Sequence, residues 1–173
     1  MNIANKVSML RVFLIPLFIL FVMYPMQGGR LIAAIVFILI SFTDILDGYL
    51  ARKMKIESSS GRIIDPLADK LLVITGFVLL AGHGIPAWAT LIVVLREIII
   101  TGLRSLTHSP SKSAFKASWP SKLKTISQMI AVVVVLLEIP YSIYIVYFSV
   151  LLTLYSGIEY LIIQRKMIKE FLA

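Results

Sequence analysis

Six mostly apolar stretches, separated by short polar or glycine-rich segments, run along the chain. A helix that crosses the hydrocarbon core of a bilayer needs about 20 mostly apolar residues. The candidate spans are residues 7–26, 31–50, 67–82, 86–103, 126–137 and 140–163. Glycines at 28, 29, 82 and 84 and a proline at 140 mark tight turns between them. The pattern predicts an all-α protein with six transmembrane helices, in which residues 1–173 form a single membrane domain.

The overall composition points the same way. Of the 173 residues, 59% are apolar and 15% are charged, whereas soluble domains average about 45–50% and about 25%. The absence of cysteine excludes a disulfide framework and a cysteine zinc site. The first span lacks a small-residue cleavage site after its apolar stretch, so we expect it to be retained rather than removed as a signal peptide.

Basic residues are distributed unevenly between the two sides of the predicted membrane domain. Of the 17 Lys and Arg residues, 14 lie at the N-terminus, in the second and fourth loops or in the C-terminal tail, and only Arg30 lies in the intervening loops. The positive-inside rule then places both termini in the cytoplasm. We attribute the net charge of +8 to this topology and to contact with anionic headgroups, not to nucleic acid.

Four aspartates flank the second loop. Asp44 and Asp47 are three residues apart at the end of the second span, and Asp65 and Asp69 are four apart at the start of the third. On helices, either spacing places both carboxylates on one face. Because consecutive spans are antiparallel, the two acidic ends can meet at the cytoplasmic side.

Four neighbouring carboxylates would repel one another strongly unless cations balanced them. Two divalent cations would do so, and oxygen ligands suit Mg²⁺ or Mn²⁺ better than zinc or copper. A two-metal site can clamp the attacking and leaving oxygens of a phosphoryl displacement. The alternative is a surface salt-bridge network in which the aspartates pair with Arg52, Lys53, Arg62 and Lys70.

This stretch carries a longer motif, D-x2-D-G-x2-A-R-x8-G-x3-D-x3-D, with every fixed position filled. The fixed residues are Asp44, Asp47, Gly48, Ala51, Arg52, Gly61, Asp65 and Asp69. The motif resembles the signature of the CDP-alcohol phosphotransferases. That resemblance implies a six-helix membrane fold, two divalent metal ions and a homodimer.

Further segments are similar to one bacterial branch of this family, in which sn-glycerol 3-phosphate is the acceptor. They are NIANKVSMLRVFLIP, REIIITGLR, SKLKT and SGIEY. The chain departs from that branch at Ser121, where glycine is usual, and at Ile98 to Ile100, where Phe-Ala-Val is usual. The resemblance implies a multi-pass enzyme of the bacterial inner membrane whose active site faces the cytoplasm.

The resemblance also implies roles for individual residues. The metals would be held by Asp44, Asp47, Asp65 and Asp69, with Asp69 as the general base. The CDP group would bind at Gly48, Ala51, Arg52, Gly61 and Asn5, although Asn5 could instead be a helix N-cap. The acceptor phosphate would bind at Arg104, Lys124, Lys122, Arg96 and Thr101, although Arg104 and the lysines could instead be cytoplasmic anchors.

The expected reaction is attack by the acceptor hydroxyl on the phosphorus nearer diacylglycerol in CDP-diacylglycerol, with release of CMP. The cationic set favours a phosphorylated acceptor, glycerol 3-phosphate or inositol phosphate, over serine; phosphatidylglycerol is a further alternative. Intramembrane carboxylates could also serve a cation transporter. That reading is weaker because the chain shows no internal repeat and the aspartates lie at helix ends. A non-catalytic scaffold would not need all four aspartates.

Overall fold

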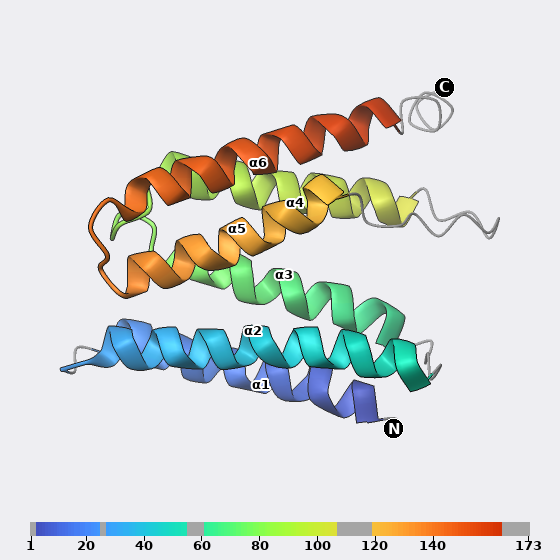
Figure 1. The fold of residues 1–173 in the computed structure, drawn as a ribbon, viewed down its shortest axis with the longest axis horizontal. Coiled ribbons are helices and arrows are strands. Elements are labelled where there is room, and N and C mark those ends of the chain that lie inside the picture. The colour runs from blue at the N-terminus through green and yellow to red at the C-terminus, as the bar shows by residue number, and fades with distance from the viewer. Residues whose placement is uncertain (1–2, 25–26, 55–60, 107–118, 164–173) are drawn as a thin grey trace.

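The computed structural model describes residues 3–24, 27–54, 61–106 and 119–163. Side chains are described within 13–24, 27–43, 70–103 and 119–163. This part of the chain forms six helices and no extended strand (Figure 1). They are α1 (Ile3–Met23), α2 (Gly29–Met54), α3 (Gly61–Leu79), α4 (Ala87–Leu106), α5 (Trp119–Leu136) and α6 (Ser142–Ile163). The predicted all-helical class is therefore confirmed for the described residues.

The largest difference from the predicted spans is at α5. The apolar pattern placed its start at residue 126, but the helix begins at Trp119 and includes Ser121. The fourth loop of the predicted topology, residues 104–125, is therefore helical at both of its ends, while 107–118 lies outside the described residues. Pro120 fits the first helical turn, where an amide hydrogen would have no partner within the helix.

The six helices run back and forth along one long axis (Figure 1). α1 packs on α2 and α3, α5 packs closely on α6, and α3 contacts α4 and α5. The first residues of α1 and the last of α6 lie at the same end of the bundle, where α2 ends and α3 begins. This end carries the aspartate motif, and we call it the motif end.

The opposite end is closed by two tight turns. Between α3 and α4, Gly82 and Gly84 have φ angles of 77° and 111°, a region that favours glycine. The Gly82 amide donates to the Ile85 carbonyl at 2.8 Å. Between α5 and α6, Glu138 and Tyr141 take φ values of 54° and 64°. The turns predicted from Gly82, Gly84 and Pro140 are confirmed.

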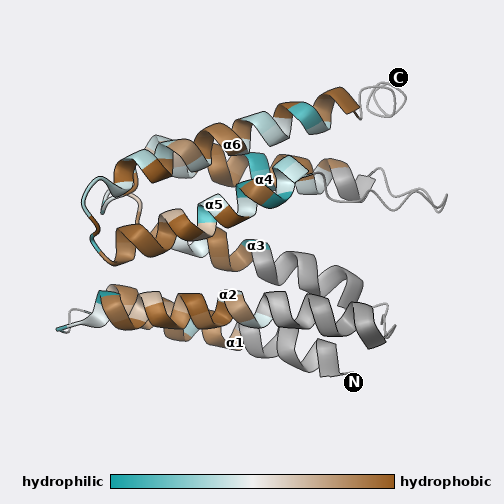
Figure 2. Ribbon diagram, viewed as in Figure 1, coloured by the Kyte–Doolittle hydropathy of each residue, from teal (hydrophilic) through white to brown (hydrophobic). Residues whose placement is uncertain are grey.

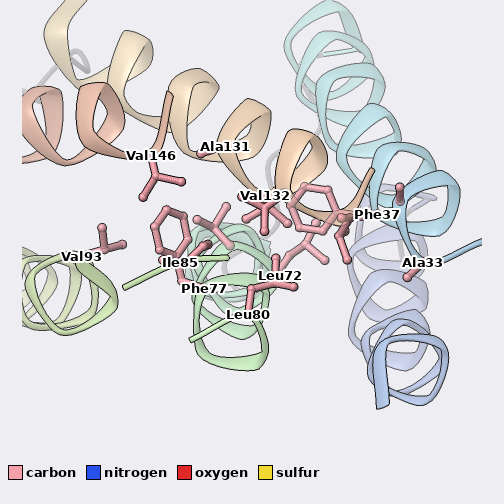
Figure 3. Packing of buried hydrophobic residues seen from close by; sticks show 14 of the residues in the cluster. Ala33, Phe37, Leu72, Phe77, Leu80, Ile85, Val93, Ala131, Val132 and Val146 are labelled. Carbon is pink, nitrogen blue, oxygen red and sulfur yellow. The ribbon is translucent and has the colours of Figure 1, made fainter. Parts of the chain in front are cut away.

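Large apolar side chains from several helices meet in one core. Phe37 of α2, Phe77 of α3 and Val132 of α5 are fully buried (Figure 3). The Phe18 ring of α1 lies 5.4 Å from the Phe37 ring, centroid to centroid. Gly76 lets α3 approach α5 closely, because a Cβ at this position would lie 3.0 Å from both Val132 methyl groups.

Most of the described helical residues are apolar (Figure 2), and many large apolar side chains are exposed on the outside of the bundle. On α6, small or polar side chains face inward: Ser149, Thr153, Ser156 and Gly157 are buried. Large side chains of the same helix, including Phe148, Leu151 and Ile158, are more than half exposed. Of the described helices, α6 alone is long and apolar enough on its own to cross a membrane; the apolar segments of α1, α2 and α3 are shorter.

The close contact at Gly76 leads to a stability prediction. Replacing Gly76 with Leu should destabilise the fold by about 1–3 kcal/mol, because an added side chain must displace Val132 and Phe37. Thermal unfolding of the detergent-solubilised protein would measure the change.

Gly102→Leu is the matched control, because a Cβ at Gly102 meets no atom within 4 Å. This variant should be at least as stable as the parent, since glycine is a poor helix former. Equal unfolding temperatures for the two variants would contradict the packing described here.

Candidate active site

The motif residues lie on two neighbouring helix ends. Asp44 and Asp47 are on the second half of α2, and Asp65 and Asp69 are on the first half of α3. α2 and α3 are in contact and antiparallel, and these ends meet at the motif end (Figure 1). The predicted juxtaposition of the two acidic helix ends is confirmed at the level of the backbone. The four carboxylates themselves lie outside the described side chains.

The residues expected to bind CDP are placed on the same helices. Gly48, Ala51 and Arg52 follow Asp47 on α2, and Gly61 is the first residue of α3. Asn5 lies inside the first turn of α1, so the N-cap alternative, which requires the residue before the helix, does not fit. Their side chains are not described, and their contacts with a nucleotide stay predictions.

Beside the motif end, a group of charged residues is buried between α4 and α5. Glu97 is 4% exposed and Lys124 is 5% exposed. The Lys124 ammonium donates to Glu97 Oε1. The same oxygen accepts a hydrogen bond of 3.1 Å from Arg96. We call Arg96, Glu97 and Lys124 the buried ion group.

The buried ion group is connected to the helices on either side. Arg96 donates to Ser156 Oγ on α6 at 2.8 Å. Gly157, the next residue on α6, makes room for Arg96: a Cβ there would lie 3.4 Å from Arg96 Cγ. Toward α3, the Lys70 ammonium donates to Thr101 Oγ1, and Thr101 donates to the Glu97 carbonyl at 2.6 Å. Lys70 directly follows Asp69, so these contacts join the motif helix α3 to α4.

The five residues expected to bind the acceptor phosphate are not all together. Arg96, Thr101 and Lys124 belong to or adjoin the buried ion group. Lys122 is exposed, and its ammonium lies 5.7 Å from the centre of the Trp119 ring. Arg104 lies on the last turn of α4, seven residues after Glu97 and on the same helical face, but its side chain is not described.

Two further residues of this region, Glu97 and Lys70, were given too little weight from the sequence alone. Glu97 has no role in the predicted site, and Lys70 is placed only in a possible salt-bridge network. The available signal was the position of an acidic residue inside an apolar span, where a charge needs a partner. The identity of that partner, Lys124, depends on how α4 and α5 pack and is not visible in the pattern.

A second polar contact within the bundle joins α5 to α6. Gln128 is 1% exposed, and its amide donates to Thr153 Oγ1 at 2.8 Å. Thr153 in turn donates to the Ser149 carbonyl at 2.7 Å. These bonds satisfy polar groups that would otherwise be costly in an apolar interior.

An apolar pocket of about 320 Å³ opens between α2 and α5. It is lined by Phe37, Ile38, Ser41 and Phe42 of α2 and by Met129, Ile130 and Val133 of α5. Ser41 and Phe42 precede Asp44 by less than one helical turn, so α2 leads directly from this pocket to the aspartate motif.

Comparison with known proteins shows the family of the chain. The family model of the CDP-alcohol phosphatidyltransferases matches residues 1–155. A Bacillus subtilis protein, "CDP-diacylglycerol--glycerol-3-phosphate 3-phosphatidyltransferase", is 35% identical over 92% of this chain and 93% of its own length. A Haemophilus influenzae protein of the same name is 36% identical over 92% and 91%. The Sodalis glossinidius protein of that name is 35% identical over 95% and 96%.

The fold, the motif and these matches define the class: the chain belongs to the CDP-alcohol phosphatidyltransferase family, and it is an enzyme. The resemblance inferred from the motif is therefore confirmed. Its relatives transfer phosphatidyl groups according to their names, and the match extends over nearly the whole of each protein.

The Gln128–Thr153 contact provides a second stability prediction. Thr153→Val should cost about 1–3 kcal/mol, because it leaves the buried Gln128 amide without its acceptor. Adding Gln128→Leu should recover most of this loss, since both polar partners are then gone. Thermal unfolding of the single and double variants would test this, with Thr153→Ser, which keeps the hydroxyl, as the control. A double variant less stable than Thr153→Val alone would contradict it.

Proposed function

We propose that this enzyme transfers the phosphatidyl group of CDP-diacylglycerol to sn-glycerol 3-phosphate, giving phosphatidylglycerophosphate and CMP. The observation that carries the proposal is the complete aspartate motif on the adjoining ends of α2 and α3, beside a buried cationic group. The names of its relatives specify the same donor and acceptor.

The lipid substrate requires contact with a bilayer, and we propose that all six helices cross it with both termini in the cytoplasm. The large apolar side chains on the outside of the bundle support this, because in water such a surface would favour association. Small residues at the α6 interface are typical of helices packed in lipid. Arg96 and Glu97 of α4 and Lys124 of α5 pair with one another in the interior. The location would be the bacterial inner membrane, and by family likeness the enzyme would be a homodimer.

Two divalent cations, Mg²⁺ or Mn²⁺, would be bound by Asp44, Asp47, Asp65 and Asp69. The donor set fits such ions, because it consists of carboxylates on two contacting helix ends. When bound, the ions would stabilise negative charge on the reacting phosphates. Asp69 would accept the proton of the acceptor hydroxyl as general base.

The nucleotide would lie over the glycine-rich part of the motif. Gly48, Ala51 and Gly61 have small or absent side chains, which permits close approach to the helix backbone. Arg52 would donate two parallel hydrogen bonds to the pyrophosphate. Asn5, on the first turn of α1 at the motif end, would contact the nucleotide.

The acceptor phosphate would bind beside α4, near α3 and α5. Arg96 and Lys124 both contact Glu97, Thr101 lies one turn further along α4, and Arg104 follows on that helix. Lys122 is exposed on the first part of α5 and would contact the phosphate only at the edge of this site. A cationic site of this kind supports a phosphorylated acceptor over serine.

The apolar pocket between α2 and α5 would take an acyl chain of the lipid donor. Its lining is almost wholly apolar, and it opens to the side of the bundle. Because α2 continues from this pocket into Asp44 and Asp47, a chain bound there would have its headgroup at the motif end.

The central test is CMP release by the purified enzyme in detergent, supplied with CDP-diacylglycerol and Mg²⁺. We expect release with glycerol 3-phosphate and none with serine or inositol 1-phosphate. EDTA should abolish it, and Asp69→Asn should lower kcat by at least about 100-fold, the usual contribution of a general base. Release with a different acceptor would keep the family reaction and contradict the proposed acceptor. No release with any of them would contradict the proposal as a whole.

The proposed topology can be tested by labelling, since the chain has no native cysteine. A cysteine introduced at His83, in the turn between α3 and α4, should react with a membrane-impermeant maleimide in intact cells. A cysteine at Ser113, between α4 and α5 in sequence, should react only in inverted vesicles. The same sidedness for both positions would contradict six spans with cytoplasmic termini.

A further inference from the structure

Glu97 has an unusual environment for an acidic residue. The structure describes the side chains of three acidic residues, and of these only Glu97 is buried. It lies on a mostly apolar helix, where an ionised carboxylate is costly unless it is paired. Its position calls for an explanation beyond helix packing, because replacing the whole Glu97–Lys124 pair with apolar residues would avoid the cost of desolvating both charges.

Glu97 contacts two cationic side chains that have a role of their own in the proposed reaction. Its Oε1 accepts from both Lys124 and Arg96, and both donors carry charges expected to bind the acceptor phosphate. Neither side chain can easily adopt another conformation, because Lys124 is itself buried and Arg96 donates a hydrogen bond to Ser156. The carboxylate therefore determines where two positive charges point.

The side chains around Glu97 are mainly cationic. Arg96 and Lys124 both donate to its carboxylate, and Lys70 donates to Thr101, on the same helix as Glu97. A phosphate monoester carries a charge of about −1.5 to −2 at neutral pH. The charge of the acceptor phosphate is therefore opposite in sign to that of these three cationic side chains.

We propose that Glu97 is a positioning residue of the acceptor site: it holds Lys124 and Arg96 in place so that the phosphate of the acceptor meets cations that are already oriented. The Lys70–Thr101 contact joins α4 to α3, which carries Asp65 and Asp69, and so relates these cations to the reacting hydroxyl. The inference rests on the proposed function, because it assumes a phosphorylated acceptor.

The test compares Glu97→Gln with the parent enzyme in two assays. In steady-state kinetics, the KM for glycerol 3-phosphate should rise about 10- to 100-fold, the factor expected when a charge-assisted hydrogen bond is lost. The KM for CDP-diacylglycerol should stay within about twofold, and Glu97→Asp should restore part of the acceptor affinity. In calorimetry, which does not depend on turnover, the Kd of glycerol 3-phosphate should rise by a similar factor.

Two further variants separate positioning from a purely structural role. Glu138→Gln removes a carboxylate from the exposed Arg30–Glu138 pair at the far end of the bundle and should leave the acceptor KM unchanged. The exchange Glu97→Lys with Lys124→Glu keeps an ion pair between α4 and α5 but moves the cation to α4. It should recover thermal stability without recovering acceptor affinity.

The outcomes are distinguishable. An unchanged acceptor KM and Kd in Glu97→Gln, with a lower unfolding temperature, would overturn the inference and leave the proposed function intact. Recovery of acceptor affinity in the exchanged variant would also overturn it. Turnover with inositol 1-phosphate in place of glycerol 3-phosphate would refute the proposed acceptor, and the same change in the KM for inositol 1-phosphate would then support the role of Glu97. Turnover with serine alone, or no binding of glycerol 3-phosphate by the parent, would overturn both.

Discussion

The ion pair between Glu97 and Lys124 is the contact on which the arrangement of α4 and α5 around the site depends. In a low-dielectric interior, each of these charges would be strongly unfavourable without the other. Arg96, Ser156 and Thr101 extend the pair to α6 and toward α3. Four helices are therefore oriented by one group of polar contacts, whereas their apolar side chains would allow many nearly equivalent packings.

The fold separates two kinds of packing along its length. Near the far end and the middle, Phe37, Phe77 and Val132 interdigitate, and Gly76 brings α3 against α5. Toward the motif end, polar and charged side chains replace apolar ones between α4, α5 and α6. The apolar core of the far end and the middle holds the helices together, and the motif end provides the charges that phosphate chemistry needs.

This division explains why the two substrates can meet. In the proposed reaction, the lipid donor would reach the site along α2 from the apolar pocket, and the water-soluble acceptor would reach it from the cationic side formed by α4 and α5. The aspartates lie on α2, which lines the pocket, and on α3, which Lys70 joins to α4. In that reaction the two substrates would reach the aspartates by separate paths. The lipid would come from the apolar pocket, and the polar acceptor would come from the cationic side chains of α4 and α5.

The sequence alone determined the helical class, the approximate position of all six helices and the aspartate motif, because hydrophobic periodicity and motif spacing are local properties of the chain. It placed the start of α5 too late, since the polar residues before 126 are helical although they interrupt the apolar pattern. It also could not show that Lys124 faces Glu97 while Lys122 faces outward, or that Lys70 reaches Thr101. Those pairings join residues 27 and 31 positions apart, so only the packing of the helices against one another could decide them.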